Sequence, residues 1–449
     1  MFAVLPLVTY LAAALLAYVC LRDLGPRRHH VLFWVFLAYS SPYALRFALQ
    51  EVFAFPFASS TILGTGEFIW TTLLLGGLIP LAALIYRFTY AGSAADLRRE
   101  LVRADAWIAF TQGWGTVVYR YLWLVAFACT LLGLFVRFVI QGDRFLLGFA
   151  ADVESRQASM GWGFVPFILS QINVTILLVA IELRRPRAEF LGLFLVQVAL
   201  AVSSGSKAGF LIPLFYCLVF ALHRRRIGLN GMRMLGFAVI GLVGLALGVL
   251  VRGYVENGVW SFDALGSPIT LFGPALGRFF ALDITQIMVA RPGTYAGIVP
   301  EFQKYTLTAA VPAALWAGKP LNPCLLLADA VGFPFVSCVA PGWVGGVLLL
   351  VGPLGVLLAP LLVGVITARI AVRALARESM PSLRHPMVFS VGLLWLGLVN
   401  EGVYYQVIPI FLPILLGLVL VYVAMVLLHG RMGWLPVVPI PGRRAAPIE

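Results

Sequence analysis

Apolar residues are grouped in long runs along the whole chain, and short polar segments separate these runs. Many runs contain about 18 or more residues without a charge, which is the length that an α-helix needs to cross a bilayer. The expected fold class is therefore all-α, a polytopic integral membrane helix bundle that forms a single domain over residues 1–449. The pattern predicts eleven spans, at Val4–Leu21, Val31–Gln50, Phe68–Tyr86, Tyr121–Ile140, Gly161–Leu183, Glu189–Ser203, Ala208–Leu222, Met234–Val251, Val344–Ala368, Met387–Asn400 and Ile408–Leu428.

Composition supports this interpretation. Hydrophobic residues make up 61% of the chain and charged residues only 11%, whereas soluble domains carry about 25% charged residues. The first residues show neither a basic segment nor a small-residue cleavage site, so we expect Val4–Leu21 to be a retained span and not a removed signal.

The formal net charge is +13, and its distribution predicts an orientation. Every second connection between the predicted spans is basic. Because cytosolic loops of membrane proteins are enriched in Arg and Lys, the amino terminus is expected outside and the carboxy terminus in the cytosol. This accounts for the basic excess without a nucleic-acid partner. The basic connections are Arg22–Arg28, Arg87–Arg103, Arg184–Arg187, Arg224–Arg233, Arg369–Arg384 and Arg431–Arg444.

The histidines all fall on the predicted cytosolic side, in connections or at helix ends. Chemistry at the outer face must therefore work without histidine. The five residues are His29, His30, His223, His385 and His429.

One predicted outer connection, residues 252–343, is much longer than the others, at about 90 residues, and loops of this length in a compact domain are usually functional. It contains two stretches with helical character, "FGPALGRFFALDITQIMVA" and "YTLTAAVPAALWA". The second is too short to span and suits a re-entrant or interfacial helix, with Trp316 at headgroup level. Lys319 would then emerge near lipid phosphates, before Pro320 ends the helix. The alternative is a simple membrane anchor.

A second outer feature is the turn "SSGSKAGF", residues 203–210, between two short predicted spans. The spans are too short for the turn to rise far above the membrane, so Lys207 is expected near the outer headgroups. The alternative is a tight helical hairpin with a snorkelling lysine.

These segments carry a resemblance. "GRFFALDITQIMVARPGTYAG" followed by "VPAALWAGKP" resembles the outer-loop pattern of the bacterial oligosaccharide repeat-unit polymerases, the Wzy-type O-antigen and exopolysaccharide polymerases. "WVGGVLLLVGPLGVLLAPLLVG" matches the Gly-rich span that follows, and "SSGSKAG" resembles an earlier turn in which Lys207 replaces an arginine. Ala313 stands where the family usually has another arginine. The resemblance covers roughly a quarter of the chain; its positions are Arg278, Gly293, Tyr295, Gly297, Pro312, Trp316, Lys319 and Pro320.

The resemblance implies a metal-independent glycosyltransferase without cofactor. It would join oligosaccharide repeat units carried on undecaprenyl pyrophosphate at the outer face of the bacterial cytoplasmic membrane. Candidate partners are membrane lipids, a chain-length regulator and a flippase. The leaving group carries several negative charges, so the site needs cations. The residues expected to bind substrate and pyrophosphate are Arg252, Arg278, Lys319, Lys207, Arg291 and Tyr295.

A carboxylate could also accept the proton of the attacking hydroxyl. Glu256, Asp283 and Glu301 are the candidates, together with Arg278 as the catalytic cation, and the sequence does not rank the three carboxylates.

Three alternatives stay open at this point. An O-antigen ligase uses the same lipid donor, but such ligases rely on an outer-face histidine. A glycosyltransferase that uses a polyprenyl monophosphate sugar would show an acidic pair in the first outer loop, where only Glu67 and the nearby Glu51 occur. A transporter or flippase predicts inverted repeats and charges at the bilayer midplane, and no repeat is evident.

The long connection contains two cysteines, Cys324 and Cys338. An oxidising exterior permits a disulfide between them, although spacing alone cannot establish the geometry.

Overall fold

The computed structural model of the chain describes helices almost throughout, and no strand occurs among the residues it describes. These residues are 4–24, 27–40, 59, 62–93, 122–136, 138–139, 164–202, 207–224, 236, 239, 243, 246, 250, 280–308, 316, 324–332, 341–374 and 384–401.

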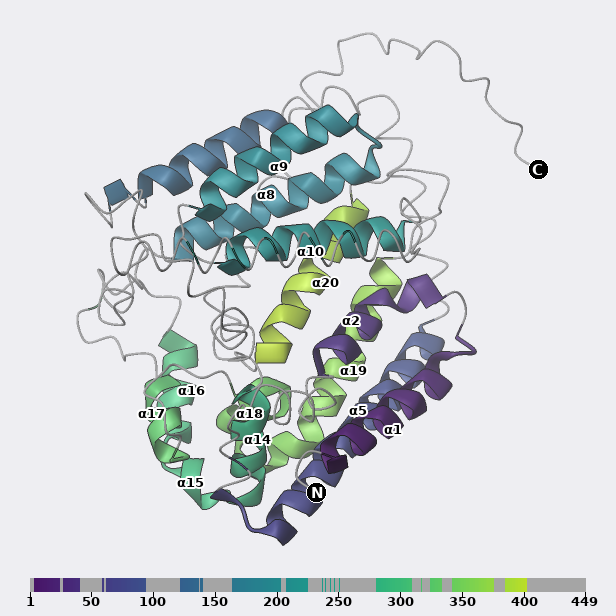
Figure 1. Cartoon of the computed structure of the whole chain (residues 1–449), viewed down its shortest axis with the longest axis vertical. Coiled ribbons are helices and arrows are strands. Elements are labelled where there is room, and N and C mark those ends of the chain that lie inside the picture. Colours follow the sequence, from purple (N-terminus) through teal and green to yellow (C-terminus); the bar gives the residue numbers. More distant parts are fainter. Residues whose placement is uncertain are drawn as a thin grey trace.

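The first group of helices is built around α5 (Thr65–Gly92), which packs between α1 (Val4–Leu21) and α19 (Gly355–Arg373) (Figure 1). Gly76 of α5 lies against Thr9 of α1, and Arg87 donates to the carbonyl of Cys20 at 2.7 Å. The second contact lies eleven residues after the first on both helices, from Thr9 to Cys20 on α1 and from Gly76 to Arg87 on α5. The two helices therefore run parallel.

Parallel packing brings the ends of α1 and α5 together. We call this the inner end; Arg22 follows α1 directly, and Arg87 lies in the last turns of α5. The 3-10 helix η1 (Arg27–His30) and α2 (Val31–Ser40) start from it. Gly392 of α20 (Arg384–Glu401) lies against Leu32 and Ile370, so α20 begins at the inner end as well.

A second group surrounds α8 (Phe164–Glu182), with α9 (Arg187–Val202), α10 (Lys207–His223) and the helix Leu122–Val136 as neighbours. Buried polar side chains of α8 connect it to three other helices. Asn173 donates to Thr130 at 2.8 Å, Thr175 bonds Ser390 of α20 at 2.8 Å, and Gln197 of α9 donates to Ser170 at 2.7 Å. Such bonds hold helices together where both surfaces are otherwise apolar.

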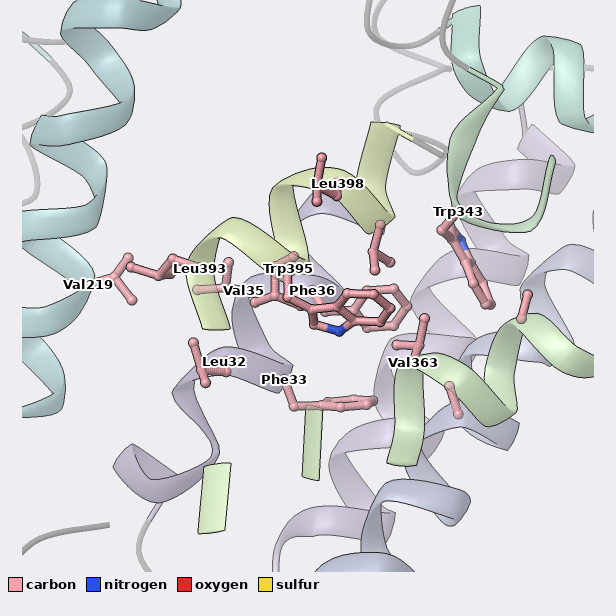
Figure 2. Packing of buried hydrophobic residues seen from close by; sticks show 14 of the residues in the cluster. Leu32, Phe33, Val35, Phe36, Val219, Trp343, Val363, Leu393, Trp395 and Leu398 are labelled. Carbon is pink, nitrogen blue, oxygen red and sulfur yellow. The ribbon is translucent and has the colours of Figure 1, made fainter. Parts of the chain in front are cut away.

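The two groups meet in an aromatic and aliphatic core formed by α2, α18 (Gly342–Val351), α19 and α20 (Figure 2). Trp343 packs edge-on against Phe36 at a ring separation of 5.4 Å, and Phe33 packs against Tyr86 of α5 at 4.9 Å. By contrast, Leu11 and Leu15 of α1 are more than half exposed. Exposed leucines along an apolar helix are typical of a lipid-facing surface.

The described parts of the long connection form short helices. They are α14 (Phe280–Ala290), α15 (Gly293–Ala296), α16 (Val299–Thr308) and α17 (Cys324–Ala330). α14 packs against α5 and α18, and α16 packs against α18, where Gln303 donates to the carbonyl of Leu350 at 2.7 Å. The predicted helix in the first stretch of this connection is confirmed as α14, and α16 covers the start of the second stretch.

The predicted span Val344–Ala368 is helical but interrupted by the 3-10 turn η5 (Gly352–Leu354). Gly352 has a φ of 69°, a conformation that favours glycine. A Cβ on Gly355 would lie 2.6 Å from the backbone nitrogen of Leu348. In a straight helix these residues would be about 10.5 Å apart, so the chain folds back at the turn.

Three described segments are long and apolar enough to cross a membrane, namely Val4–Leu21, Thr65–Gly92 and Gly342–Arg373. An all-helical chain with membrane-spanning potential is therefore confirmed, whereas the number of eleven spans stays a prediction. Four shorter apolar helices, Leu122–Val136, Ile168–Glu182, Pro213–His223 and His385–Val399, fall within other predicted spans. Span Ile408–Leu428 lies outside the described residues, as does most of Met234–Val251 and the second half of Val31–Gln50.

Candidate functional site

Three polar side chains, Asp283, Thr285 and Gln286, lie close together on the otherwise apolar helix α14, and all three are buried. Asp283 accepts a hydrogen bond from the hydroxyl of Ser59, which belongs to the chain before α5. Thr285 donates to the carbonyl of Pro341, directly before α18. A short helix is thus fixed on two sides by its own polar residues.

Gln286 binds a third partner, the first turns of α5. Its side-chain amide donates to the Thr72 hydroxyl at 2.8 Å and to the Phe68 carbonyl at 3.1 Å. The Thr72 hydroxyl in turn donates to the same carbonyl at 2.7 Å. Unsatisfied polar groups are costly at membrane depth, so these bonds fix α14 in position and rotation.

An ion pair closes the site at the surface. Arg291, directly after α14, donates from Nη2 to Glu67 Oε2 at 2.9 Å and from Nε to Oε1 at 3.3 Å. Nη2 also donates to the carbonyl of Ile62 at 2.9 Å. The hydrogen bonds to Glu67 raise the pKa of Arg291 above its ordinary value. Glu67 also accepts from the backbone of Gly64 at 2.9 Å and so caps the start of α5.

The ion pair lies at the opposite end of α5 from the inner end. Twenty residues of helix separate Glu67 from Arg87, which is about 30 Å and equals the thickness of a hydrocarbon core. Gln286 contacts α5 one to two turns further in, so α14 extends from this outer end into the bundle.

The remaining predicted site residues of the described chain lie on three other helices, α15, α16 and α10. Tyr295 of α15 is almost fully buried, and burial raises its pKa. Glu301 lies exposed in the first turn of α16. Lys207 is the first residue of α10. The structure therefore places Asp283 in the first turn of α14 and Arg291 directly after its last turn, whereas Glu301 belongs to a different helix, α16.

The other residues predicted from the sequence lie outside the described residues, so their roles stay predictions. They are Arg252, Glu256, Arg278 and Lys319 of the proposed catalytic and pyrophosphate-binding set, and Pro312, Pro320 and Cys338 of the long connection. Trp316 is exposed, as expected for an interfacial residue.

The sequence did not reveal the partners of α14, namely Ser59, Thr72 and Glu67, which forms the ion pair with Arg291. The signal available was the cluster of polar residues in "LDITQI" within an apolar helix, because such residues at membrane depth need partners and are commonly functional. The arrangement offers a buried carboxylate, Asp283, with the Ser59 hydroxyl fixed beside it. A surface cation, Arg291, follows the other end of the same helix. Comparison of the chain with family models, with curated proteins and with solved structures gives no match.

Proposed function

We propose that the chain is a polymerase that joins oligosaccharide repeat units carried on undecaprenyl pyrophosphate, at the outer face of the bacterial cytoplasmic membrane. In this proposal the chain crosses the membrane eleven times, with its amino terminus outside and its carboxy terminus in the cytosol. The long connection 252–343 then faces the side on which lipid-linked repeat units are polymerised.

The observation that carries the proposal is the position of α14. Its end is bound to Glu67, about 30 Å along α5 from Arg87, which lies in the predicted basic stretch Arg87–Arg103. If basic connections face the cytosol, α14 and its carboxylate lie in the outer half of the membrane. A lipid-linked pyrophosphate has its charged group at this depth and its sugars just above.

The chemistry requires a cation and a base. A hydroxyl of one repeat unit attacks the anomeric carbon of the other, its proton passes to a carboxylate, and the anomeric carbon–oxygen bond breaks. The electron pair of that bond leaves with the lipid pyrophosphate, and arginine or lysine stabilises the charge. Asp283, held by Ser59, and the exposed Glu301 are the described candidates for the base. Arg278, two residues before α14, is the first candidate for the cation.

The decisive experiment places purified protein in nanodiscs with a lipid-linked repeat unit that is radiolabelled in its sugar. We expect ladders of longer glycans together with release of undecaprenyl pyrophosphate. Arg278→Ala should remove most product, and Arg278→Lys should restore only part of it, because a lysine lacks the planar fork. One charge-assisted contact contributes about 1.5–3 kcal/mol, or about ten- to a hundredfold in rate.

Lys304→Ala provides the matched control, since Lys304 is an exposed cation on α16 of the same connection. It should leave the ladder unchanged, while Lys319→Ala should shorten it. Movement of the lipid across the membrane without any new glycosidic bond would instead identify a transporter. Activity that survives Arg278→Ala combined with Lys319→Ala would refute the phosphate-binding role of both residues.

The orientation has an independent test. Reporter fusions after residues 203 and 278 should read outside, and those after residues 225 and 377 should read inside. An inside signal at Arg278 would place the long connection away from the outer substrate and end the proposal.

A further inference from the structure

At the inner end, far along the bundle from α14, four titratable side chains are buried together. We call them the inner cluster; they are Glu182, His223, Arg224 and His385. Three helices supply them, since Glu182 ends α8, His223 ends α10 and His385 follows the first residue of α20. The cluster plays no part in the chemistry proposed above.

Glu182, the acid in this cluster, forms an ion pair with Arg224. Arg224 donates from Nε to Glu182 Oε2 at 2.7 Å and from Nη2 to Oε1 at 2.8 Å, a bidentate pair with side-chain exposures of 2% and 0%. His385 Nδ1 lies 4.0 Å from Glu182 Oε1. The Arg224 guanidinium therefore balances most of the negative charge of Glu182. The carboxylate can still attract one positive charge on the His385 imidazole.

The two histidines contact each other directly. The Nε2 atoms of His223 and His385 are 3.2 Å apart, within hydrogen-bond distance. Phe389 stacks on the His223 ring at 4.9 Å, and Phe220 packs edge-on to the His385 ring at 5.8 Å. These aromatic neighbours shield the contact between the two Nε2 atoms from water.

This contact limits how many protons the pair can hold. A hydrogen bond between two Nε2 atoms needs one N–H donor and one acceptor, so at least one ring must be neutral. One imidazolium is compatible with the bond and lies near Glu182. A second proton leaves two donors facing each other and places two like charges about 3 Å apart in a buried site, which is strongly unfavourable.

We propose that His223 and His385 form one buried binding site for a single proton, and that a second proton opens the contact between α10 and α20 at the inner end. The ligand of this site is the proton itself. The inference does not depend on the proposed function.

The charges around the pair support this assignment. Glu182 of α8 and Arg224 of α10 face it directly. Other elements that pack against α10 and α20 carry His29 and His30 on η1, and Arg369 and Arg373 at the end of α19. On α9, Glu189 is bound to Arg185 at 2.8 Å, while α2 and α18 contribute no acidic or basic residue along their described lengths. Among the described residues of these elements, basic groups thus outnumber acidic ones, which opposes a second proton.

The test is a double-mutant cycle read as pH dependence. Thermal unfolding of the full-length protein is followed in detergent between about pH 7.5 and pH 5, the range in which histidine changes charge. His223→Gln and His385→Gln keep a hydrogen-bonding group but remove the second proton. We expect the unfolding midpoint of the wild type to fall as the pH falls. Each single variant should show a smaller fall, and the reduction should be the same in both variants. The double variant should lose no more than either single variant, because one shared site has been removed.

Independent titration gives the opposite result. If the two substitutions remove different parts of the pH dependence and these parts add in the double variant, the shared site is refuted. The same holds if neither substitution changes the pH dependence.

A second measurement covers variants that fold poorly. Cys217 is buried on α10, six residues before His223. In a chain with Cys20, Cys129, Cys324 and Cys338 replaced by serine, a pyridyl disulfide reagent, which reacts with thiols at neutral and acidic pH, reports opening of α10. We expect labelling of Cys217 to accelerate severalfold as the pH falls, and not to do so with His223→Gln. Constant labelling over the whole range would overturn the proposal.

Discussion

Arg291 and Glu67 stand 224 positions apart in the chain, and their ion pair fastens the end of α14 to the first turn of α5. The two side chains are 42% and 35% exposed, so water screens the pair and its own contribution to stability is small. The pair matters because it holds the end of α14 against the first turn of α5. It also occupies the Arg291 guanidinium, which the resemblance assigns to pyrophosphate.

This pairing yields a prediction that separates two roles of Arg291. If Arg291 serves as a clasp, Arg291→Ala and Glu67→Ala should reduce glycan synthesis equally, and the double variant should resemble either single one. If Arg291 binds pyrophosphate, only Arg291→Ala should reduce synthesis, because Glu67→Ala leaves the guanidinium available. Product ladders from the nanodisc assay, compared at equal protein levels, distinguish these outcomes.

Asp283 provides the second prediction. Asp283→Asn keeps an oxygen that can accept from Ser59 but removes the basicity, so it should leave the unfolding midpoint nearly unchanged while abolishing glycan synthesis. Asp283→Ala also leaves a buried Ser59 hydroxyl without its acceptor, which costs about 1–3 kcal/mol. Glu301→Gln on α16 is the companion variant, because it tests the other described candidate for the base. Full activity of Asp283→Asn would transfer the role of base to another carboxylate.

Close packing of α5 and α19 gives a third prediction, on stability alone. A Cβ on Gly364 would lie 2.8 Å from the backbone oxygen of Ala82 and 2.8 Å from Ile85 Cγ2. Because a backbone atom cannot give way easily, Gly364→Ala should destabilise the protein by about 1–3 kcal/mol.

Gly77 of α5 is the control, since a Cβ there meets nothing within 4 Å. Gly77→Ala should be neutral or stabilising by up to about 1 kcal/mol, as alanine favours helix. Equal unfolding midpoints for the two variants would show that α5 and α19 do not approach as closely as described.

The sequence predicted the elements of this fold better than their partners. The bounds of α1 match the predicted span Val4–Leu21, because a run of apolar residues defines its own length. α5 extends beyond the predicted Phe68–Tyr86 at both ends. At its start, Glu67 remains helical since its carboxylate caps the backbone of Gly64, a local contact that hydropathy does not register.

Contacts between distant residues were beyond reach of the sequence. The predicted spans and the distribution of basic connections placed His223 and His385 at the same side of the membrane, but their contact joins residues 162 positions apart. The same is true of Gln286 and Thr72, and of the turn at Gly352 that folds α18 back against α19. For the candidate site, the sequence identified α14 and Asp283, whereas Ser59 became visible only through the packing.

His30 predicts a pH dependence of stability. It is buried in η1, with Nδ1 at 2.9 Å from the hydroxyl of Tyr86. Burial, together with the nearby His29, lowers the pKa of His30 to about 4. Between that value and the ordinary value of 6.5 the unfolded chain binds more protons than the folded one, so stability rises with pH. The contribution is complete above about pH 6.5 and lost as the pH falls towards 4, in total about 3 kcal/mol.

The check is the unfolding midpoint against pH for wild type, His30→Gln and His29→Gln. His30→Gln should flatten the curve below about pH 6.5, because glutamine can still bind the Tyr86 hydroxyl but does not titrate. His29 is only partly buried, so His29→Gln should keep most of the slope of the unfolding midpoint against pH. A slope that is unchanged by His30→Gln would mean that other groups cause it.

The last prediction concerns the buried pair of Glu182 and Arg224, which have side-chain exposures of 0% and 2%. Removing one partner from such a pair leaves a charge without compensation in a medium of low polarity. Glu182→Gln or Arg224→Met alone should therefore destabilise the protein by about 3–5 kcal/mol. Replacing both residues, Glu182→Leu with Arg224→Met, removes the desolvation cost along with the attraction, so most of that stability should return. If the double variant instead loses as much as the sum of both single variants, the two side chains are not energetically coupled and the ion pair does not act as a unit. Unfolding midpoints of the four proteins at neutral pH decide between these outcomes.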